Sequence, residues 1–226
     1  MKLNPFLLFI FLLPVSSAFA EWKETDKSSK SVDPLRKDGY SVNAITPVFN
    51  QLVAFPYPEG FEIAYEKTTG PSYIQESVLH GETPDKWTQM ITLTGAKELA
   101  LNPKATPPAV ISALAQGFTK ACPGSYAGSG LGELKFGEYD GFAAVVSCGT
   151  AKSTGEPYSE STLMVAVRGK SDFYTVQWAI RGAPSSTPIS INDAEWAERL
   201  KKITPIKLCP IVSGEAAPYP SCVDKK

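Results

Sequence analysis

Alternation of apolar and polar residues predicts several strands in the first half of the chain. Apolar side chains recur at every second position over residues 61–65, and over residues 87–93 with Gln89 as the exception. This period of two is typical of half-buried β-strands. A further strand is expected over residues 72–79, between these two, because turn-forming residues lie on both sides of this segment. An apolar run over residues 48–55 comes first. Short polar turns between sequential strands predict an antiparallel meander.

The period changes to that of a helix after Thr106, which is a good N-cap residue and is followed by two prolines that suit a first helical turn. The apolar residues that follow share one helical face: Ile111, Leu114, Ala115, Phe118 and Cys122. Residues 142–148 then predict an apolar strand that carries Cys148 on the same face as Phe142. A helix packed on that face would bring the two cysteines together.

The second half repeats the strand pattern and ends in another helix. Residues 163–167 and 174–180 predict a hairpin around a turn at 169–172. A last helix begins after Asn192 and stops at Pro205. The order of elements predicts an α+β fold, in which helices pack on an antiparallel sheet of about six to eight strands.

The first twenty residues have the features of a secretory signal peptide, with Lys2, the apolar stretch 6–15 and small residues at Ala18 and Ala20. We expect cleavage after Ala20 and a periplasmic or extracellular location. Polar residues dominate the next stretch, which predicts a flexible leader over 21–44. A single domain is expected over 45–208, followed by a C-terminal tail at 209–226.

All four cysteines follow this signal, and an even number in an oxidising compartment indicates disulfides. Three connectivities are possible. We favour Cys122–Cys148 because of the helix and strand faces described above, and Cys209–Cys222 because only a short proline-rich tail separates the partners. A zinc site is disfavoured, since the chain has no C-x-x-C spacing and one histidine.

Charge and hydropathy narrow the range of partners. The formal net charge is −1, and loss of Lys2 makes the mature chain slightly more acidic. A nucleic-acid-binding surface needs a basic surplus, so no nucleic-acid partner is expected. No stretch after the signal approaches the roughly 20 apolar residues of a membrane-spanning helix, so we expect no stable membrane insertion after signal removal.

Several segments together resemble a known family. They are the PEGF start of a strand at 58–61, a mid-chain helix, GEYDG at 137–141, FYTV at 173–176 and the ERLKKI helix end at 198–203. In layout these resemble the DcrB/PsbP/Mog1-like α/β sandwich family of bacterial envelope proteins. The resemblance implies non-enzymatic accessory, adaptor or chaperone-like roles.

No catalytic motif is complete. His80 and Glu82 match half of a zinc-deaminase motif, but the cysteine half is absent, so His80 is expected to be an ordinary strand-end or turn histidine. The glycine-rich run over 124–132 fails the dinucleotide-binding pattern and predicts a flexible loop. Glu138 and Asp140 are expected to lie in a solvated turn. Four aromatic residues fall at core-facing positions and are assigned to packing: Trp87, Tyr174, Trp178 and Trp196.

These observations predict no catalytic, cofactor-binding or metal-binding residues, and four disulfide cysteines: Cys122, Cys148, Cys209 and Cys222. The expected function is that of a non-catalytic binding or accessory protein of the bacterial cell envelope. Its partner would be a protein or a cell-envelope ligand, bound through the sheet or the loops at 124–132 and 149–159. The alternatives are an extracytoplasmic hydrolase with an unrecognised site and a secreted inhibitor or effector.

Overall fold

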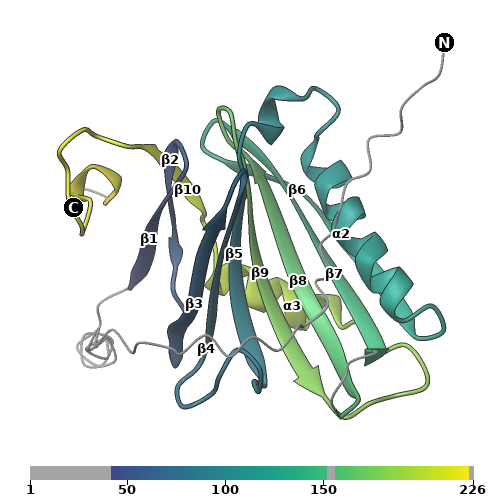
Figure 1. The fold of residues 1–226 in the computed structure, drawn as a ribbon. Helices are drawn as coiled ribbons and strands as arrows, with labels where there is room; N and C mark the ends of the chain where they lie inside the picture. Colours follow the sequence, from purple (N-terminus) through teal and green to yellow (C-terminus); the bar gives the residue numbers. More distant parts are fainter. Residues whose placement is uncertain (1–41, 152–155, 224–226) are drawn as a thin grey trace. The chain divides into compact units, whose positions relative to one another are not determined.

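A computed structural model describes residues 42–151 and 156–223. The expected signal peptide, nearly all of the leader and part of the loop at 149–159 lie outside the described residues. The strands form two antiparallel sheets, and two α-helices pack on the larger one, so the α+β prediction is confirmed (Figure 1). All of the described residues lie in one compact unit.

The large sheet has seven strands in the order β3-β4-β5-β9-β8-β7-β6. Their bounds are β3 Phe61–Thr69, β4 Ser72–Leu79, β5 Gln89–Ala96, β6 Tyr126–Phe136, β7 Tyr139–Ala151, β8 Tyr158–Arg168 and β9 Phe173–Gly182. The meander β3-β4-β5 and the hairpin β8-β9 occur where the alternating pattern predicts them. The two groups join because β5 pairs with β9 along its whole length.

The small sheet has three strands in the order β1-β2-β10. They are β1 Asn43–Val48, β2 Gln51–Pro56 and β10 Lys207–Pro210. The strands β1 and β2 divide the apolar run at 48–55, and their hairpin turn contains Phe49 at a φ of 53°. Leu208 faces Val53 across the β2–β10 ladder, so the segment after the last helix returns to the start of the domain.

The helices cover opposite faces of the large sheet. They are α2 Pro107–Ala121 and α3 Asp193–Lys202, with short 3-10 turns η1 Leu99–Leu101 and η2 Pro220–Cys222. Ile111 of α2 packs with Ala144, Val146 and Met164 on one face. Trp196 of α3 packs on the other face in the main core, to which residues of the small sheet also belong. Within the described ranges, no helix is long and apolar enough to cross a membrane.

Both helix starts follow from local chemistry. The Thr106 hydroxyl accepts a hydrogen bond from the Ala109 N–H, and prolines occupy the first turn of α2. The Asn192 side chain accepts from two N–H groups at the start of α3, while basic residues lie in its last turn, where the helix dipole favours them. The helix starts are those that the sequence predicts.

The glycine-rich run at 124–132 differs from its prediction. Tyr126–Phe136 forms β6, an edge strand that pairs with β7, so the prediction of a flexible loop over this run is wrong. The ladder with β7 supplies backbone partners that the local composition does not reveal. The glycines have local reasons: the Tyr126 hydroxyl lies where a Cβ on Gly128 would be, and Gly132 has a φ of 113° beside a register shift.

Candidate functional site

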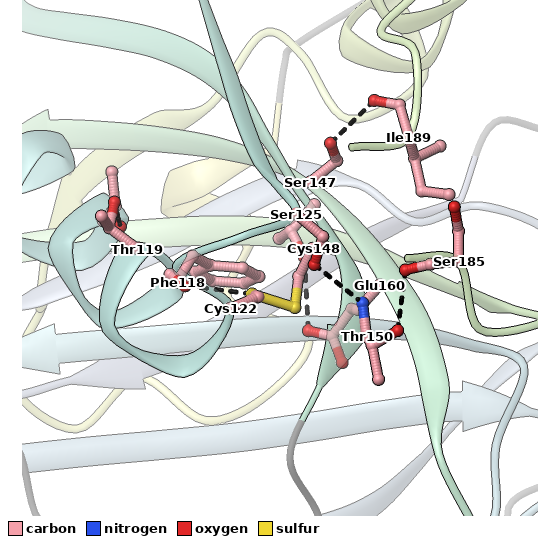
Figure 2. The surroundings of a disulfide bond; sticks show 12 residues. Phe118, Thr119, Cys122, Ser125, Ser147, Cys148, Thr150, Glu160, Ser185 and Ile189 are labelled. Atoms are coloured by element: carbon pink, nitrogen blue, oxygen red, sulfur yellow. Dashed lines mark hydrogen bonds between the residues drawn. A yellow bond between two sulfur atoms is a disulfide. The ribbon is translucent and has the colours of Figure 1, made fainter. Parts of the chain in front are cut away.

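The Cys122–Cys148 disulfide marks where α2 stops covering its face of the large sheet. Cys122 follows the last residue of α2, and Cys148 lies in β7 at a Cα–Cα distance of 5.7 Å. Cys148 pairs across the ladder with Glu160 of β8 (Figure 2). The sheet face is therefore apolar where α2 covers it and becomes polar beyond the disulfide, at Glu160.

The connection from β9 to α3 is fastened to β7 beside this disulfide. The Ser147 hydroxyl donates to the Ile189 carbonyl at 2.9 Å, and the Thr150 hydroxyl donates to the Ser185 carbonyl at 2.7 Å (Figure 2). A Cβ on Gly149 would lie 2.3 Å from the Thr187 carbonyl oxygen. Residues 149–151 thus belong to β7, and the described start of the expected 149–159 loop is a packed strand end.

Beyond α2, the exposed part of this sheet face forms a pocket of about 320 Å³, which we call the sheet-face pocket. Strands β4, β5, β8 and β9 form its floor, while Phe118 of α2 and the β4–β5 connection form its sides. The lining residues are Glu76, Pro84, Trp87, Met90, Thr92, Phe118, Glu160, Thr162, Gln177, Ala179 and Arg181.

Arg181 is the charge of the sheet-face pocket with the most contacts to neighbouring side chains. Its guanidinium lies 3.6 Å from the ring centroid of Trp87 and 3.9 Å from that of Tyr158. Its Nη2 donates to the Tyr158 hydroxyl at 3.0 Å, and its Nε lies 3.4 Å from Glu160 Oε2. Two aromatic contacts and two polar contacts hold the guanidinium in one position.

Trp87 reaches this position because it precedes β5. The alternating pattern assigns it to the same face as Ile91, but Trp87 packs with Val78, Met90 and Ala179 on the opposite face. Trp87 is buried, as the sequence predicts, with 8% of the residue exposed. The period-of-two rule fails here because it holds only within a continuous strand.

The two carboxylates of the sheet-face pocket, Glu76 and Glu160, both have a raised pKa. Burial raises the pKa of Glu160, although the attraction of Arg181 acts against this shift. Burial also raises the pKa of Glu76, where Arg181 opposes the shift and Asp85 adds to it. Carboxylates that are costly to ionise gather at binding and catalytic sites more than elsewhere.

Two larger pockets have different linings. One of about 540 Å³ lies between the small sheet and the C-terminal tail and is lined mainly by apolar residues and prolines, with Tyr219 among them. Another of about 650 Å³ lies between α3 and the large sheet. Glu195 and Arg199 line that pocket and pair with each other along the helix. We select the smaller sheet-face pocket because both members of its ion pair are largely buried, with Arg181 22% and Glu160 18% exposed, whereas Glu195 of the other pair is 57% exposed.

The residues that the sequence analysis considered for catalysis lie outside the sheet-face pocket. His80 is at the end of β4 with its side chain 85% exposed and its Nδ1 3.0 Å from Glu62 Oε2. Asp140 forms an exposed ion pair with Lys135 in the β6–β7 hairpin. Among the described residues, no group of three or more potential ligands could hold a metal ion. Both disulfides join the cysteines that the sequence pairs, with Cys209–Cys222 at a Cα–Cα distance of 5.6 Å.

Comparison with known proteins gives similarity of layout. Solved structures that resemble this one include LpqN of Mycobacterium tuberculosis, described as involved in cell envelope biogenesis, with 12% identity and a TM-score of 0.42, covering 80% of this chain and 98% of LpqN. Another is the Ran-binding protein Mog1p of Saccharomyces cerevisiae, with 12% identity and a TM-score of 0.39, covering 74% of this chain and 86% of Mog1p. No family model and no curated protein matches the chain.

The solved structures LpqN and Mog1p match a DcrB/PsbP/Mog1-like fold, the layout that the sequence resembles. The likeness to LpqN and Mog1p concerns the fold alone. Neither the residues of the sheet-face pocket nor a ligand for it can be taken from these structures, so the function has to be argued from the pocket.

Proposed function

We propose that the mature chain is a non-catalytic binding protein of the bacterial cell envelope, secreted or periplasmic, and that its ligand binds in the sheet-face pocket. The observation that carries this proposal is the charge cluster of Glu76, Glu160 and Arg181 on the uncovered part of a sheet face. Taking charges out of water costs free energy, and apolar residues pack on the same face under α2. A charged cluster kept beside an apolar surface supports a role in recognition.

The two disulfides support the compartment. Disulfides persist in oxidising surroundings such as the periplasm or the extracellular medium. Together with the expected signal peptide, they favour a partner from the envelope, either a protein or a cell-envelope ligand. The Cys122–Cys148 bond also fixes the end of α2 that borders the pocket, so the pocket is preorganised before a ligand arrives.

A hydrolase is the second candidate, and one observation favours it. Glu76 and Glu160 line one pocket and both have a raised pKa, a property of general acids in hydrolysis. Against this role, the charged partner of Glu160 is Arg181 rather than a second carboxylate. A carboxylate that is held in an ion pair is a poor proton donor, so we place binding first.

The experiment is an NMR titration of the mature, disulfide-bonded protein labelled with ¹⁵N. The probes are 1,4-diaminobutane, 1,4-butanediol, glucose and glutarate, and the signals to follow are the Trp87 indole N–H and the amides of Thr92 and Gln177. We expect at least one probe to shift these signals with saturation. Thr92→Trp, which fills the pocket, should abolish the shifts of the Trp87 and Gln177 signals, while Lys135→Trp on β6 should leave them unchanged.

Two results would overturn this proposal. One is that no probe shifts the pocket signals, or that Thr92→Trp has no effect on the shifts. The other is turnover of p-nitrophenyl glycosides or esters that is lost in Glu76→Gln or Glu160→Gln, because this result would establish the hydrolase.

A further inference from the structure

The sheet-face pocket carries more negative than positive charge. Glu76, Glu160 and Arg181 line it, and Asp85 lies close enough to raise the pKa of Glu76. Glu160 and Arg181 form an ion pair and offset each other. Arg181 also attracts Glu76 and lowers its pKa by more than Asp85 raises it, but Arg181 forms its ion pair with Glu160. The net negative charge that a ligand in the pocket would experience is therefore that of the Glu76 carboxylate.

Arg181 is not positioned to neutralise Glu76 by direct contact. Its Nε and Nη2 are directed at Glu160 and Tyr158, and the two aromatic rings restrict the plane of the guanidinium. Moving it to Glu76 would give up these four contacts. Within the described part of the chain, no hydrogen-bond donor contacts the Glu76 carboxylate, which is only half-buried and faces the pocket.

Glu76 belongs to a row of three side chains across the floor of the pocket. The register places Thr92 of β5 directly beside Glu76 of β4, and Gln177 of β9 directly beside Thr92. All three line the pocket. Neighbouring side chains in such a row have Cβ atoms about 5 Å apart, so a single small group can contact more than one of them.

The row offers hydrogen-bond acceptors in excess of donors. Gln177 Nε2 donates to the Thr175 hydroxyl at 3.1 Å, which leaves the Gln177 side-chain carbonyl for another partner. The Glu76 carboxylate only accepts when ionised, and the Thr92 hydroxyl can accept as well. A ligand that matches this surface brings several N–H or O–H donors and a positive charge.

We propose that the sheet-face pocket binds a primary ammonium group, with Glu76 as its counter-ion and Thr92 and Gln177 as further acceptors. An ammonium group has three donors and no acceptor, so it complements both the charge and the hydrogen-bonding capacity of the row. The source is a free amine or a lysine side chain of a partner. This assignment rests on the proposed function because it uses the same pocket.

The test compares an amine with its neutral analogue. Titration of the ¹⁵N-labelled mature protein with 1,4-diaminobutane should shift the Thr92 and Gln177 amides and the Trp87 indole N–H. 1,4-Butanediol, which has hydroxyls in place of the ammonium groups, should bind at least tenfold more weakly. Glu76→Gln should weaken the binding of diaminobutane at least tenfold. Glu133→Gln, which removes an exposed carboxylate from β6, is the matched control and should bind as the wild type does.

A second titration separates the two sources of the ammonium group. The probe is the peptide Gly-Lys-Gly with blocked termini. Binding of the peptide at least as tight as that of diaminobutane supports a lysine side chain of a partner, and weaker binding supports a free amine. Thermal melting of Glu76→Gln checks that a loss of binding does not come from unfolding.

The assignment is overturned if butanediol and diaminobutane bind equally well or if Glu76→Gln binds the amine as the wild type does. Binding of glucose or glutarate at these signals, without binding of the amines, overturns the ammonium assignment and leaves the pocket as the binding site. Failure of every probe overturns the proposed function together with this inference.

Discussion

Two halves of one sheet face differ in character. Under α2, β7 and β8 present small or flexible apolar side chains, including Ala144, Val146 and Met164. Four residues from Met164 along β8, the same face presents Glu160, whose side chain is 18% exposed, whereas Met164 is fully buried. One strand therefore contributes to the core at one end and to the candidate site at the other, and the position of the helix decides which.

The largest expected effect comes from placing a charge in the covered half. Met164→Glu would bury a carboxylate among apolar side chains of α2 and β7 without a partner, so we expect a loss of about 4 kcal/mol or more. Urea denaturation of the disulfide-bonded protein measures this loss. The reverse exchange on the same strand, Glu160→Met, should cost only about 1 to 2 kcal/mol, because Arg181 keeps Tyr158 and some solvent. Equal losses would show that the two halves do not differ as described.

Removing the bond at the border of the two halves should come next in size. For Cys122→Ala with Cys148→Ala, the chain-entropy model gives a loss of roughly 3 to 4 kcal/mol, since 26 positions separate the partners. For Cys209→Ala with Cys222→Ala, we expect about 1 to 2 kcal/mol, because β10 can stay paired with β2 while the tail frays. Denaturant melts of the two double variants give the comparison.

Cys222 is 5% exposed and packs with Leu52 and Ala54 of β2. If the tail variant proves as unstable as the first, this packing makes the tail part of the cooperative unit. The expected domain end at residue 208 would then be wrong.

Asp172 lies outside the pocket, and its pKa is lowered, whereas the pKa values of Glu76 and Glu160 in the pocket are raised. Burial alone would raise the pKa of Asp172, but hydrogen bonds from the Glu98 N–H at 2.8 Å and from the Asn50 side chain at 2.9 Å hold it below its ordinary value. Its contribution to stability is therefore present above the ordinary pKa of an aspartate and is lost as the pH falls through the lowered value. Asp172→Asn should cost about 2 to 3 kcal/mol at pH 7.

Urea melts from pH 7 downward test this prediction. The difference between Asp172→Asn and wild type should shrink as the wild-type carboxyl becomes protonated. A difference that stays constant with pH would mean that the ionisation of Asp172 does not contribute.

The smallest expected effect has the opposite sign. Burial raises the pKa of Glu76, so the folded protein holds this proton more tightly than the unfolded chain does, and stability falls as the pH rises from the ordinary value of 4.5 through the raised one. Glu76→Gln should therefore increase stability at pH 7 by about 0.5 kcal/mol, since Glu76 is partly solvated and its charge is screened. Thermal melts at pH 7 and at about pH 3 measure the effect, and the gain should vanish at the lower pH, where the carboxyl is protonated in both the folded and the unfolded state.

Local patterns were sufficient for several elements. Thr106 and Asn192 cap the two helices because their side chains satisfy N–H groups within three residues. The hairpin of β8 and β9 follows from alternation and a short turn. The pairing of Cys122 with Cys148 follows from a helical face and a strand face that each carry one thiol.

The candidate site could not be predicted in this way. Glu76, Glu160 and Arg181 come from three strands, and β5 lies between the first of these strands and the other two. Nothing in their local sequence shows that β5 would pair with β9 and bring the two strand groups into one sheet. Trp87 was assigned to packing, and its second role under Arg181 follows from a neighbour that is 94 positions away in the chain.

The sequence by itself determined the α+β class, both helix starts, the β3-β4-β5 meander and the β8-β9 hairpin, because these depend on periodicity and on contacts between near neighbours. It favoured the observed disulfide pairs among three possible connectivities. Tertiary structure alone decided the conformation of the glycine-rich run, which forms a strand because its backbone pairs with that of β7. It also decided that α2 leaves part of its sheet face uncovered. Long-range pairing sets which residues meet, and a chain's local pattern records only which side of an element each residue occupies.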